Sequence, residues 1–273
     1  MSDPLNSPIV RHSPSTGAGS PDVWGIYEPD TGSIQYICAD PATKKAALID
    51  VVWNFDPKNY KFTSESMDQV LDLVEKNGLS VEWVLDTHPH ADHVMASAQL
   101  KERTGAPNAI GALVPEIAKI WADLYNLPNA FDPDRDFDHL FQEGETFKIG
   151  ELEAKVMLSP GHTLGSITYV CGDAAFVHDT LMQPDAGTSR SDFPGGTTEE
   201  LWESIQDILA LPGNTRLYIG HDYGTDDRDE PRWEATVDEH RAHNIHVKDG
   251  TKREDYIARR QKRDATLSLP NRI

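Results

Sequence analysis

Hydrophobic and polar positions alternate in short runs near the start of the chain. The segment WGIYEPDTGSIQYICADPATKKAALIDVV, residues 24–52, predicts three short strands separated by the turn sequences PDTGS and DPATKK. Over residues 64–77 the apolar positions change to helical spacing, with Met67, Val70 and Val74 on one face. We therefore expect a meander of strands followed by a helix.

The same rhythm of strands and helices continues to the end of the chain. Strands are expected over 81–88, 109–112, within 146–178 and over 216–222. Helices are expected over 91–105 (closed by Gly105), 115–125, 198–213 and, split near 249–250, over 231–266. Residues 126–145 are expected to form a loop. This order predicts an α/β protein with two β-rich halves packed sheet on sheet and helices outside.

The ends of the chain differ from its middle in composition. Residues 1–21 are rich in Pro, Ser and Gly and predict a flexible lead-in, which leaves 22–273 as a single domain with C-terminal helices. The two cysteines, Cys38 and Cys171, are too few for a disulfide framework and lie in strand-like runs, so we expect packing thiols.

Charge removes several classes of function. The 273 residues include 25 Lys and Arg against 45 Asp and Glu, a formal net charge of −20. Such a field repels phosphate backbones and anionic membrane surfaces, so we expect no nucleic-acid partner and no membrane partner. The sequence contains neither a spanning apolar stretch nor a secretory signal at its start, so a cytoplasmic location is expected.

Candidate chemistry is concentrated in the run THPHADH at positions 87–93. His88 and His90 lie two residues apart after a predicted strand and can therefore converge on one ion. Asp92 and His93 are expected to turn in from the first turn of the next helix. Three further motifs, PGHT with His162, HDT with Asp179 and GHDY with His221, each follow a strand-like run. These motifs together predict a metal centre.

The motif set THPHADH…PGHT…HDT…GHDY resembles the metallo-β-lactamase superfamily over roughly residues 22–247. The resemblance implies a four-layer αββα sandwich with metals at one edge of its two sheets. The run HDTLMQPDAGTSRSDFPGG most resembles the persulfide dioxygenase branch, which includes β-lactamase hydrolase-like proteins. Position 178 is His where many members have Gly, and the PDAGTS stretch is longer than in typical relatives. Because relatives usually continue past residue 273, a further C-terminal segment is expected.

The ligand count allows one metal or two. A dinuclear zinc site would use His88, His90 and His162 for one ion, Asp92, His93 and His221 for the other, and Asp179 as the bridge. Such a site would hydrolyse glutathione-type thioesters, as glyoxalase II does. A mononuclear Fe(II) site would use only His88, His162 and Asp179, a facial triad with open positions for O2 and sulfur. The resemblance implies this second reading, with the other four residues orienting ligands and water.

The resemblance also implies the reaction. The expected enzyme is an iron-dependent sulfur dioxygenase that oxidises a glutathione-like persulfide with O2 to sulfite and thiol. Asp92 and His221 are the candidate catalytic residues. Arg190, held by Asp192, and Tyr223 are expected to bind the substrate, because a guanidinium suits the carboxylates of glutathione. A homodimer is left open as the assembly, as is a non-catalytic metal-binding module as the function.

Overall fold

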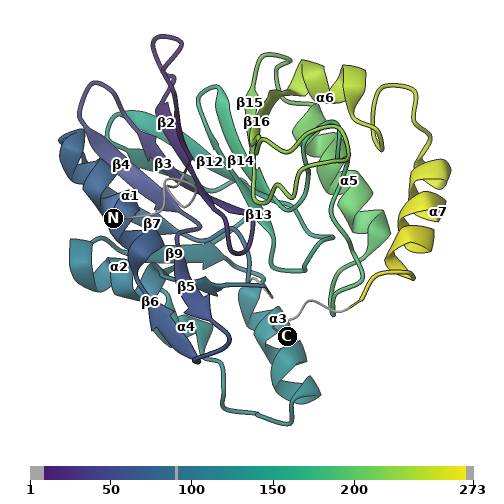
Figure 1. The fold of residues 1–273 in the computed structure, drawn as a ribbon, viewed down its shortest axis with the longest axis horizontal. Coiled ribbons are helices and arrows are strands. Elements are labelled where there is room, and N and C mark those ends of the chain that lie inside the picture. Colours follow the sequence, from purple (N-terminus) through teal and green to yellow (C-terminus); the bar gives the residue numbers. More distant parts are fainter. Residues whose placement is uncertain (1–8, 90–91, 269–273) are drawn as a thin grey trace.

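A computed structural model describes residues 9–89 and 92–268, and in it two β-sheets pack face to face between two layers of helices (Figure 1). One outer layer, at the left of Figure 1, contains α1 (Glu65–Lys76) and α2 (Ser97–Thr104). The other, at the right, contains α5 (Thr198–Leu209), α6 (Val237–His243) and α7 (Arg253–Asp264). The predicted four-layer α/β sandwich is therefore confirmed.

The first sheet has seven strands in the order β1-β2-β3-β4-β7-β9-β10. Its strands are β1 (Val10–Ser13), β2 (Asp22–Glu28), β3 (Ser33–Ala39), β4 (Lys45–Ile49), β7 (Ser80–Leu85), β9 (Asn108–Gly111) and β10 (His139–Phe141). The antiparallel meander β2–β3–β4 follows from the two predicted turn sequences. β4 and β7 are parallel, because α1 carries the chain across between them.

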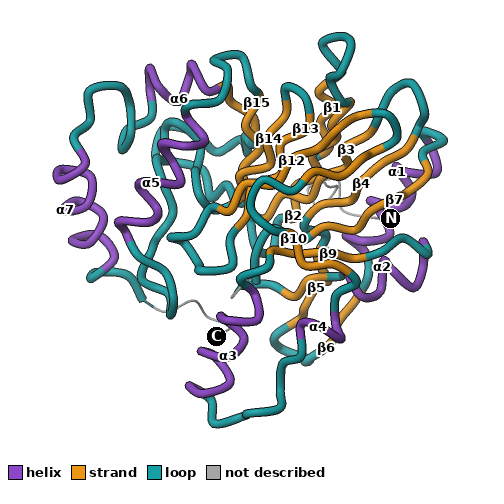
Figure 2. The backbone as a smooth tube through the Cα atoms, turned by 180° about the vertical axis from the view of Figure 1, so that it is seen from behind, coloured by secondary structure: helices purple, strands orange, loops and turns teal. Residues whose placement is uncertain are grey.

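The second sheet has six strands in chain order: β11 (Thr146–Ile149), β12 (Leu152–Leu158), β13 (Ile167–Cys171), β14 (Ala174–His178), β15 (Arg216–Ile219) and β16 (Glu234–Thr236). A small third sheet joins β6 (Lys61–Thr63), β5 (Val52–Asp56) and β8 (Val94–Met95). It lies near α3 (Val114–Leu124) and α4 (Pro133–Asp136), at the lower end of the molecule in Figure 2.

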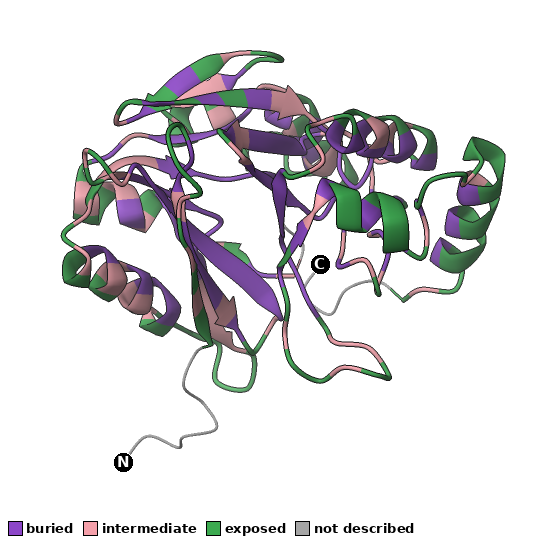
Figure 3. Cartoon of the chain, turned by 90° about the horizontal axis from the view of Figure 1, so that it is seen from above, coloured by how far each residue is buried: buried purple, intermediate pink, exposed green. Residues whose placement is uncertain are grey.

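The buried residues lie where the layers meet (Figure 3). Between the two sheets, the ring of Tyr36 packs edge-on against Phe176 and Tyr218, with centroids 5.4 Å away in both cases. The Tyr36 hydroxyl donates to the carbonyl of Ile219 and so ties one sheet to the other. Cys38 and Cys171 are buried in the same core, as expected of packing thiols. Burial of each such large side chain contributes about 1.5–3 kcal/mol, so this layer fixes the position of the strands.

The predicted lead-in over 1–21 contains a strand within its described part, residues 9–21. Residues 10–13 form β1, which pairs antiparallel with β2. Arg216, about 200 residues later in the sequence, holds this segment in place. Its guanidinium donates to the Ser13 hydroxyl and to the carbonyl of Pro21. The composition of residues 1–21 does not predict this long-range contact.

The helix expected over 91–105 begins only at Ser97. Val94 and Met95 form β8 instead and pair with β5, a strand about 40 residues earlier. Asp92 and His93 are therefore in a turn before β8 and not in a helix. Two further differences are short elements: α4 and β10 interrupt the expected loop 126–145, and β16 precedes α6. No helix in the described part of the chain is long and apolar enough to cross a bilayer.

Candidate metal centre

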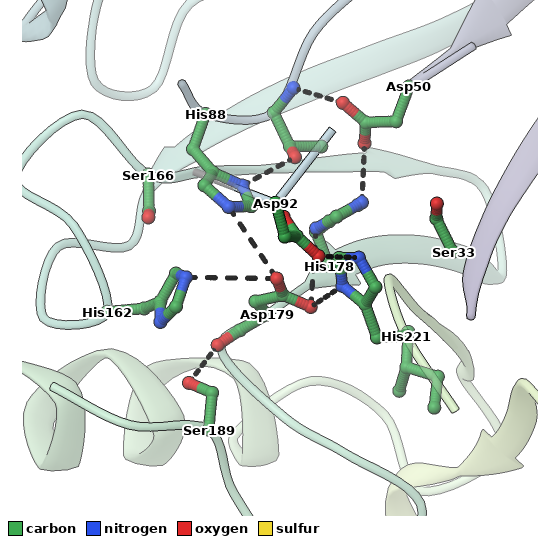
Figure 4. A network of polar contacts seen from close by, with 12 residues as sticks. Ser33, Asp50, His88, Asp92, His162, Ser166, His178, Asp179, Ser189 and His221 are labelled. Carbon is green, nitrogen blue, oxygen red and sulfur yellow. Dashed lines mark hydrogen bonds and ion pairs between the residues drawn. The ribbon is translucent and has the colours of Figure 1, made fainter. Parts of the chain in front are cut away.

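The candidate ligands leave their strands at one edge of the facing sheets (Figure 4). His88 follows β7, and His162 lies four residues after the end of β12. His178 ends β14 and Asp179 comes next, while His221 follows β15. Because β14 and β15 are parallel, their carboxyl ends meet at the same edge. The convergence of these side chains is therefore a consequence of the sheet topology.

His88, His162 and Asp179 form a first group around a small gap. The Nε2 atoms of His88 and His162 each lie 3.7 Å from the same atom, Oδ2 of Asp179. Two ligand atoms held by one tetrahedral ion at about 2.1 Å are about 3.4 Å apart. All three side chains are buried. The two nitrogen-to-oxygen distances are close to this tetrahedral value, and the N2O composition suits an ion such as Fe(II) or Zn(II).

Asp92, His93 and His221 form a second group on the other side of the same carboxylate. Nε2 of His221 lies 2.9 Å from Oδ2 of Asp92, and Nε2 of His93 lies 3.7 Å from its Oδ1. His221 also contacts Asp179, with Nδ1 2.8 Å from Oδ1. Asp179 therefore points one carboxylate oxygen toward each group, and a carboxylate that bridges two ions would lie in this position. His90, the remaining predicted ligand, lies outside the described residues.

Hydrogen bonds orient the two imidazoles of the first group. Nδ1 of His162 donates to the carbonyl of Arg190 at 2.8 Å, because a carbonyl can only accept. Nδ1 of His88 lies 3.1 Å from the Thr87 hydroxyl, and the Thr87 amide donates to Asp50 at 2.8 Å. In both rings Nδ1 is engaged and Nε2 faces the gap, which is how metal-binding histidines are usually held.

The electrostatics of the cluster favour a cation. Burial would raise the pKa of Asp179, but the imidazoles of His221 and His178 hold it well below its usual range. Burial likewise opposes ionisation of Asp92, yet the hydrogen bond and charge of His221 lower its pKa to about 2. Burial and the neighbouring imidazoles hold the pKa of His88 well below its usual value. Burial lowers the pKa of His221, but the carboxylates of Asp179 and Asp92 outweigh it and raise that pKa to about 10. The cluster thus combines ionised carboxylates with a neutral His88 and a protonated His221, which must release its proton if it binds a metal.

His178 and Asp50 belong to the cluster but were given no role by the motifs. Nε2 of His178 lies 3.3 Å from Asp50 Oδ2, and Nδ1 lies 3.5 Å from Asp179 Oδ1. Ligand atoms of His88, His178 and Asp179 all lie within 4.8 Å of one another. Gly220 leaves room for the ring, since a Cβ there would lie 2.2 Å from it. The strand-end position of Asp50, directly after β4, was the signal that could have identified it.

Arg190, predicted to bind substrate, has its guanidinium engaged within the protein. Nε and Nη2 contact the two oxygens of Asp192 at 2.6 and 2.8 Å. Nη1 donates to the carbonyl of Ser268 at 2.8 Å, and the group stacks 4.8 Å from the ring centre of Phe193. Asp192 therefore holds Arg190, as the sequence predicts, while substrate binding by either residue stays a prediction.

Tyr223, the third predicted substrate residue, lies over the second group. Its ring stacks on His221 with centroids 5.7 Å apart and an interplanar angle of 15°. At 69% exposure the ring faces the solvent. It covers His221 from outside, and its contact with substrate stays a prediction.

Comparisons with known proteins agree with this geometry. The metallo-beta-lactamase superfamily model matches residues 36–221. The chain is 50% identical over 254 residues to the beta-lactamase hydrolase-like protein of Xylella fastidiosa, covering 93% of this chain but only 58% of that protein. It is 30% identical over 217 residues to "Persulfide dioxygenase ETHE1, mitochondrial" of Bos taurus, covering 78% and 73%. The crystal structure of ETHE1 from Myxococcus xanthus aligns with a TM-score of 0.72 at 29% identity, covering 91% and 93%.

Proposed function

Because this chain belongs to the metallo-beta-lactamase superfamily of metal-dependent enzymes, we propose that it is a mononuclear Fe(II) dioxygenase of organic persulfides. The balanced reaction is RSSH + O2 + H2O giving RSH + SO3²⁻ + 2 H⁺. The terminal sulfur loses four electrons to O2, and the S–S bond breaks. The 30% identity to a bovine protein named persulfide dioxygenase supports the choice of reaction.

The observation that carries the proposal is the difference between the two ligand groups. In the first group, two imidazole nitrogens face one carboxylate oxygen across 3.7 Å, with a gap between them. In the second group, Nε2 of His221 lies 2.9 Å from the Asp92 carboxylate and Nδ1 forms a 2.8 Å hydrogen bond with Asp179. The first group thus presents two imidazole nitrogens and one carboxylate oxygen, which is the donor set of the Fe(II) facial triad. In the second group, Nδ1 of His221 is already engaged with Asp179.

Residues of this chain then have separate tasks. Fe(II) bound by two imidazoles and one carboxylate would supply O2 activation, with open positions for O2 and a sulfur ligand. His162 is fixed by the Arg190 carbonyl, and His88 by Thr87. Asp92 and His221 hold a proton between Oδ2 and Nε2, and His221 also contacts Asp179, the carboxylate of the first group.

The test is O2 uptake after anaerobic Fe(II) loading, with glutathione persulfide and an alkyl persulfide as separate substrates. We expect one iron per chain and sulfite formed in step with O2 consumed. His162→Ala should abolish uptake, while His243→Ala, which removes an exposed imidazole from α6, should not change it. Absence of uptake with both persulfides in iron-loaded protein would refute the proposal.

The second candidate is a dinuclear zinc hydrolase of thioesters. The bridging position of Asp179, with one oxygen toward each group, is the observation that favours it. Asp92→Asn separates the candidates by metal content, measured by elemental analysis with Asp249→Asn as an exposed control. The dinuclear enzyme would fall from two ions per chain to one, whereas the dioxygenase should contain one ion in both variants. Hydrolysis of a glutathione thioester by zinc-loaded protein would favour the hydrolase.

A further inference from the structure

A cavity of about 540 Å³ opens directly beside the metal cluster and is lined in part by His88, His93 and His162. Its volume falls within the roughly 300–1,000 Å³ of small-molecule sites. Its walls come from the β5–β6 hairpin, α3, the segment 131–137 and residues 193–194. A ligand that presents sulfur to the cluster would therefore place the rest of its body in this cavity.

The walls of the cavity are apolar and largely aromatic. Among the described residues, seven aromatic side chains from four separate segments line it: Phe55, Phe62, Trp121, Tyr125, Phe131, Phe137 and Phe193. Phe62, Tyr125 and Phe131 are also about half exposed, so the apolar surface continues outward from the cavity. Exposed apolar groups gathered around a cavity indicate a ligand-binding site rather than ordinary surface.

The charges at the cavity do not suit an anionic carrier. Among the described residues that line it, none is Lys or Arg, and three are Asp: Asp86, Asp132 and Asp136. The nearby guanidinium of Arg135 lies 2.8 Å from Asp136 and 4.0 Å from Asp132, so it is already paired with wall carboxylates. A carboxylate brought into this cavity would lose hydration without gaining a cationic partner.

Arg190, the cation that the sequence offered for this role, does not line the cavity. Its guanidinium stacks on Phe193, whose ring does line it, and is bound by Asp192 and the Ser268 carbonyl. Glutathione carries two carboxylates, and neither would meet an available guanidinium among the lining residues described.

From this cavity we propose that the sulfur carrier is an uncharged apolar thiol, with an alkyl or aryl body against the aromatic walls and its sulfur at the metal. The proposal rests on the proposed function for the identity of the sulfur chemistry. It replaces the expected glutathione-like carrier with a hydrophobic one. Each methylene buried in an apolar cavity increases affinity about fourfold, because it contributes about 0.8 kcal/mol.

The primary test measures binding without turnover. Iron-loaded protein is titrated anaerobically by calorimetry with 1-butanethiol, 1-hexanethiol, 1-octanethiol and glutathione. We expect Kd to fall by up to fourfold per methylene, and glutathione to bind at least 100-fold more weakly than octanethiol. A Kd that does not depend on chain length, or glutathione binding as tightly as octanethiol, would overturn the proposal.

Two variants on α3 test whether the thiols bind in this cavity. Trp121→Lys places a cation in the wall and should weaken octanethiol binding at least tenfold while improving that of glutathione. Leu124→Lys makes the same change on the same helix at a residue that is 61% exposed and outside the wall, and should leave both affinities unchanged. Equal effects of the two substitutions would contradict the assigned cavity. Circular dichroism verifies folding, and the wild-type series decides the question if Trp121→Lys does not fold.

The outcomes separate this inference from the proposed function. If Kd falls with chain length but neither persulfide is oxidised, the apolar carrier stands and the dioxygenase is refuted. If glutathione persulfide is oxidised while Kd is insensitive to chain length, the dioxygenase stands and the apolar carrier is refuted.

Discussion

Gly161, the residue before His162, is a position where one added methyl group should damage both the fold and the site. Its φ is +135°, a conformation that L residues rarely adopt. A Cβ at this position would lie 2.2 Å from the backbone nitrogen of Leu201 and 2.3 Å from its Cα. Leu201 belongs to α5, so the obstacle is helix backbone that cannot rotate away.

The magnitude follows from two separate contributions. Forcing Ala into this φ costs about 1–3 kcal/mol, and overpacking against fixed atoms costs about 1–3 kcal/mol more. Gly161→Ala should therefore lower the free energy of unfolding by roughly 4 kcal/mol, a large share of the ~5–15 kcal/mol of a typical domain. Gly78→Ala is the matched control, because Gly78 has a φ of +64° and no atom within 4 Å of its Cβ position. It should cost only about 1 kcal/mol.

Urea unfolding of chelator-treated protein measures the stability of both variants, and calorimetric titration with Fe(II) measures metal binding. Because Gly161 directly precedes His162 and fixes the position of its backbone, Gly161→Ala should also displace the His162 imidazole. Loss of groups that orient a metal ligand weakens metal binding by ~10-fold or more, and we expect a similar loss here. Gly78→Ala should bind the metal like the wild type. Equal losses of stability in the two variants would show that α5 yields easily and that the close approach does not constrain His162.

Two further predictions concern residues away from the metal. Burial lowers the pKa of His240 to about 4, so its contribution to stability is complete above pH 6.5 and is lost as the pH falls toward 4. Between pH 7.5 and 5.0 the free energy of unfolding of metal-free His240→Gln, measured with urea, should fall by about 2 kcal/mol less than that of the wild type. Parallel pH profiles of the two proteins would contradict the lowered pKa of His240. Arg216→Met breaks an ion pair with Asp173 in which the Arg216 side chain is only 7% exposed. It should lower the free energy of unfolding by about 3 kcal/mol. Arg241→Met, from an exposed pair with Asp249, should cost at most about 1 kcal/mol by the same measurement.

Sequence reasoning succeeded where the cause of the structure is local. Turn residues placed β2, β3 and β4, and helical spacing placed α1 and α5, because neighbouring residues determine these elements. Polar residues that follow strands were expected to converge, and the structure brings His88, His162 and Asp179 together. The rule worked because parallel strands end at a common edge.

The failures have a common cause in contacts between distant parts of the chain. β8 displaced the first turn of the predicted helix because it pairs with β5. β1 formed in a segment of loop-like composition because Arg216 and β2 hold it. The cavity beside the metal could not be predicted either, since its aromatic walls come from segments that carry no shared motif. Such features depend on tertiary packing, which local pattern does not encode.

Arg190 has contacts within the protein that its motif does not describe. Its guanidinium meets the carboxylate of Asp192 two residues later, so a charge that the sequence offered to substrate is neutralised within the same loop. Its backbone carbonyl, which no side-chain motif describes, accepts the hydrogen bond from His162. The Arg190–Asp192 ion pair therefore lies in the segment whose backbone carbonyl orients His162. With this cation engaged, the apolar carrier that we propose would depend on the aromatic walls of the cavity for its recognition.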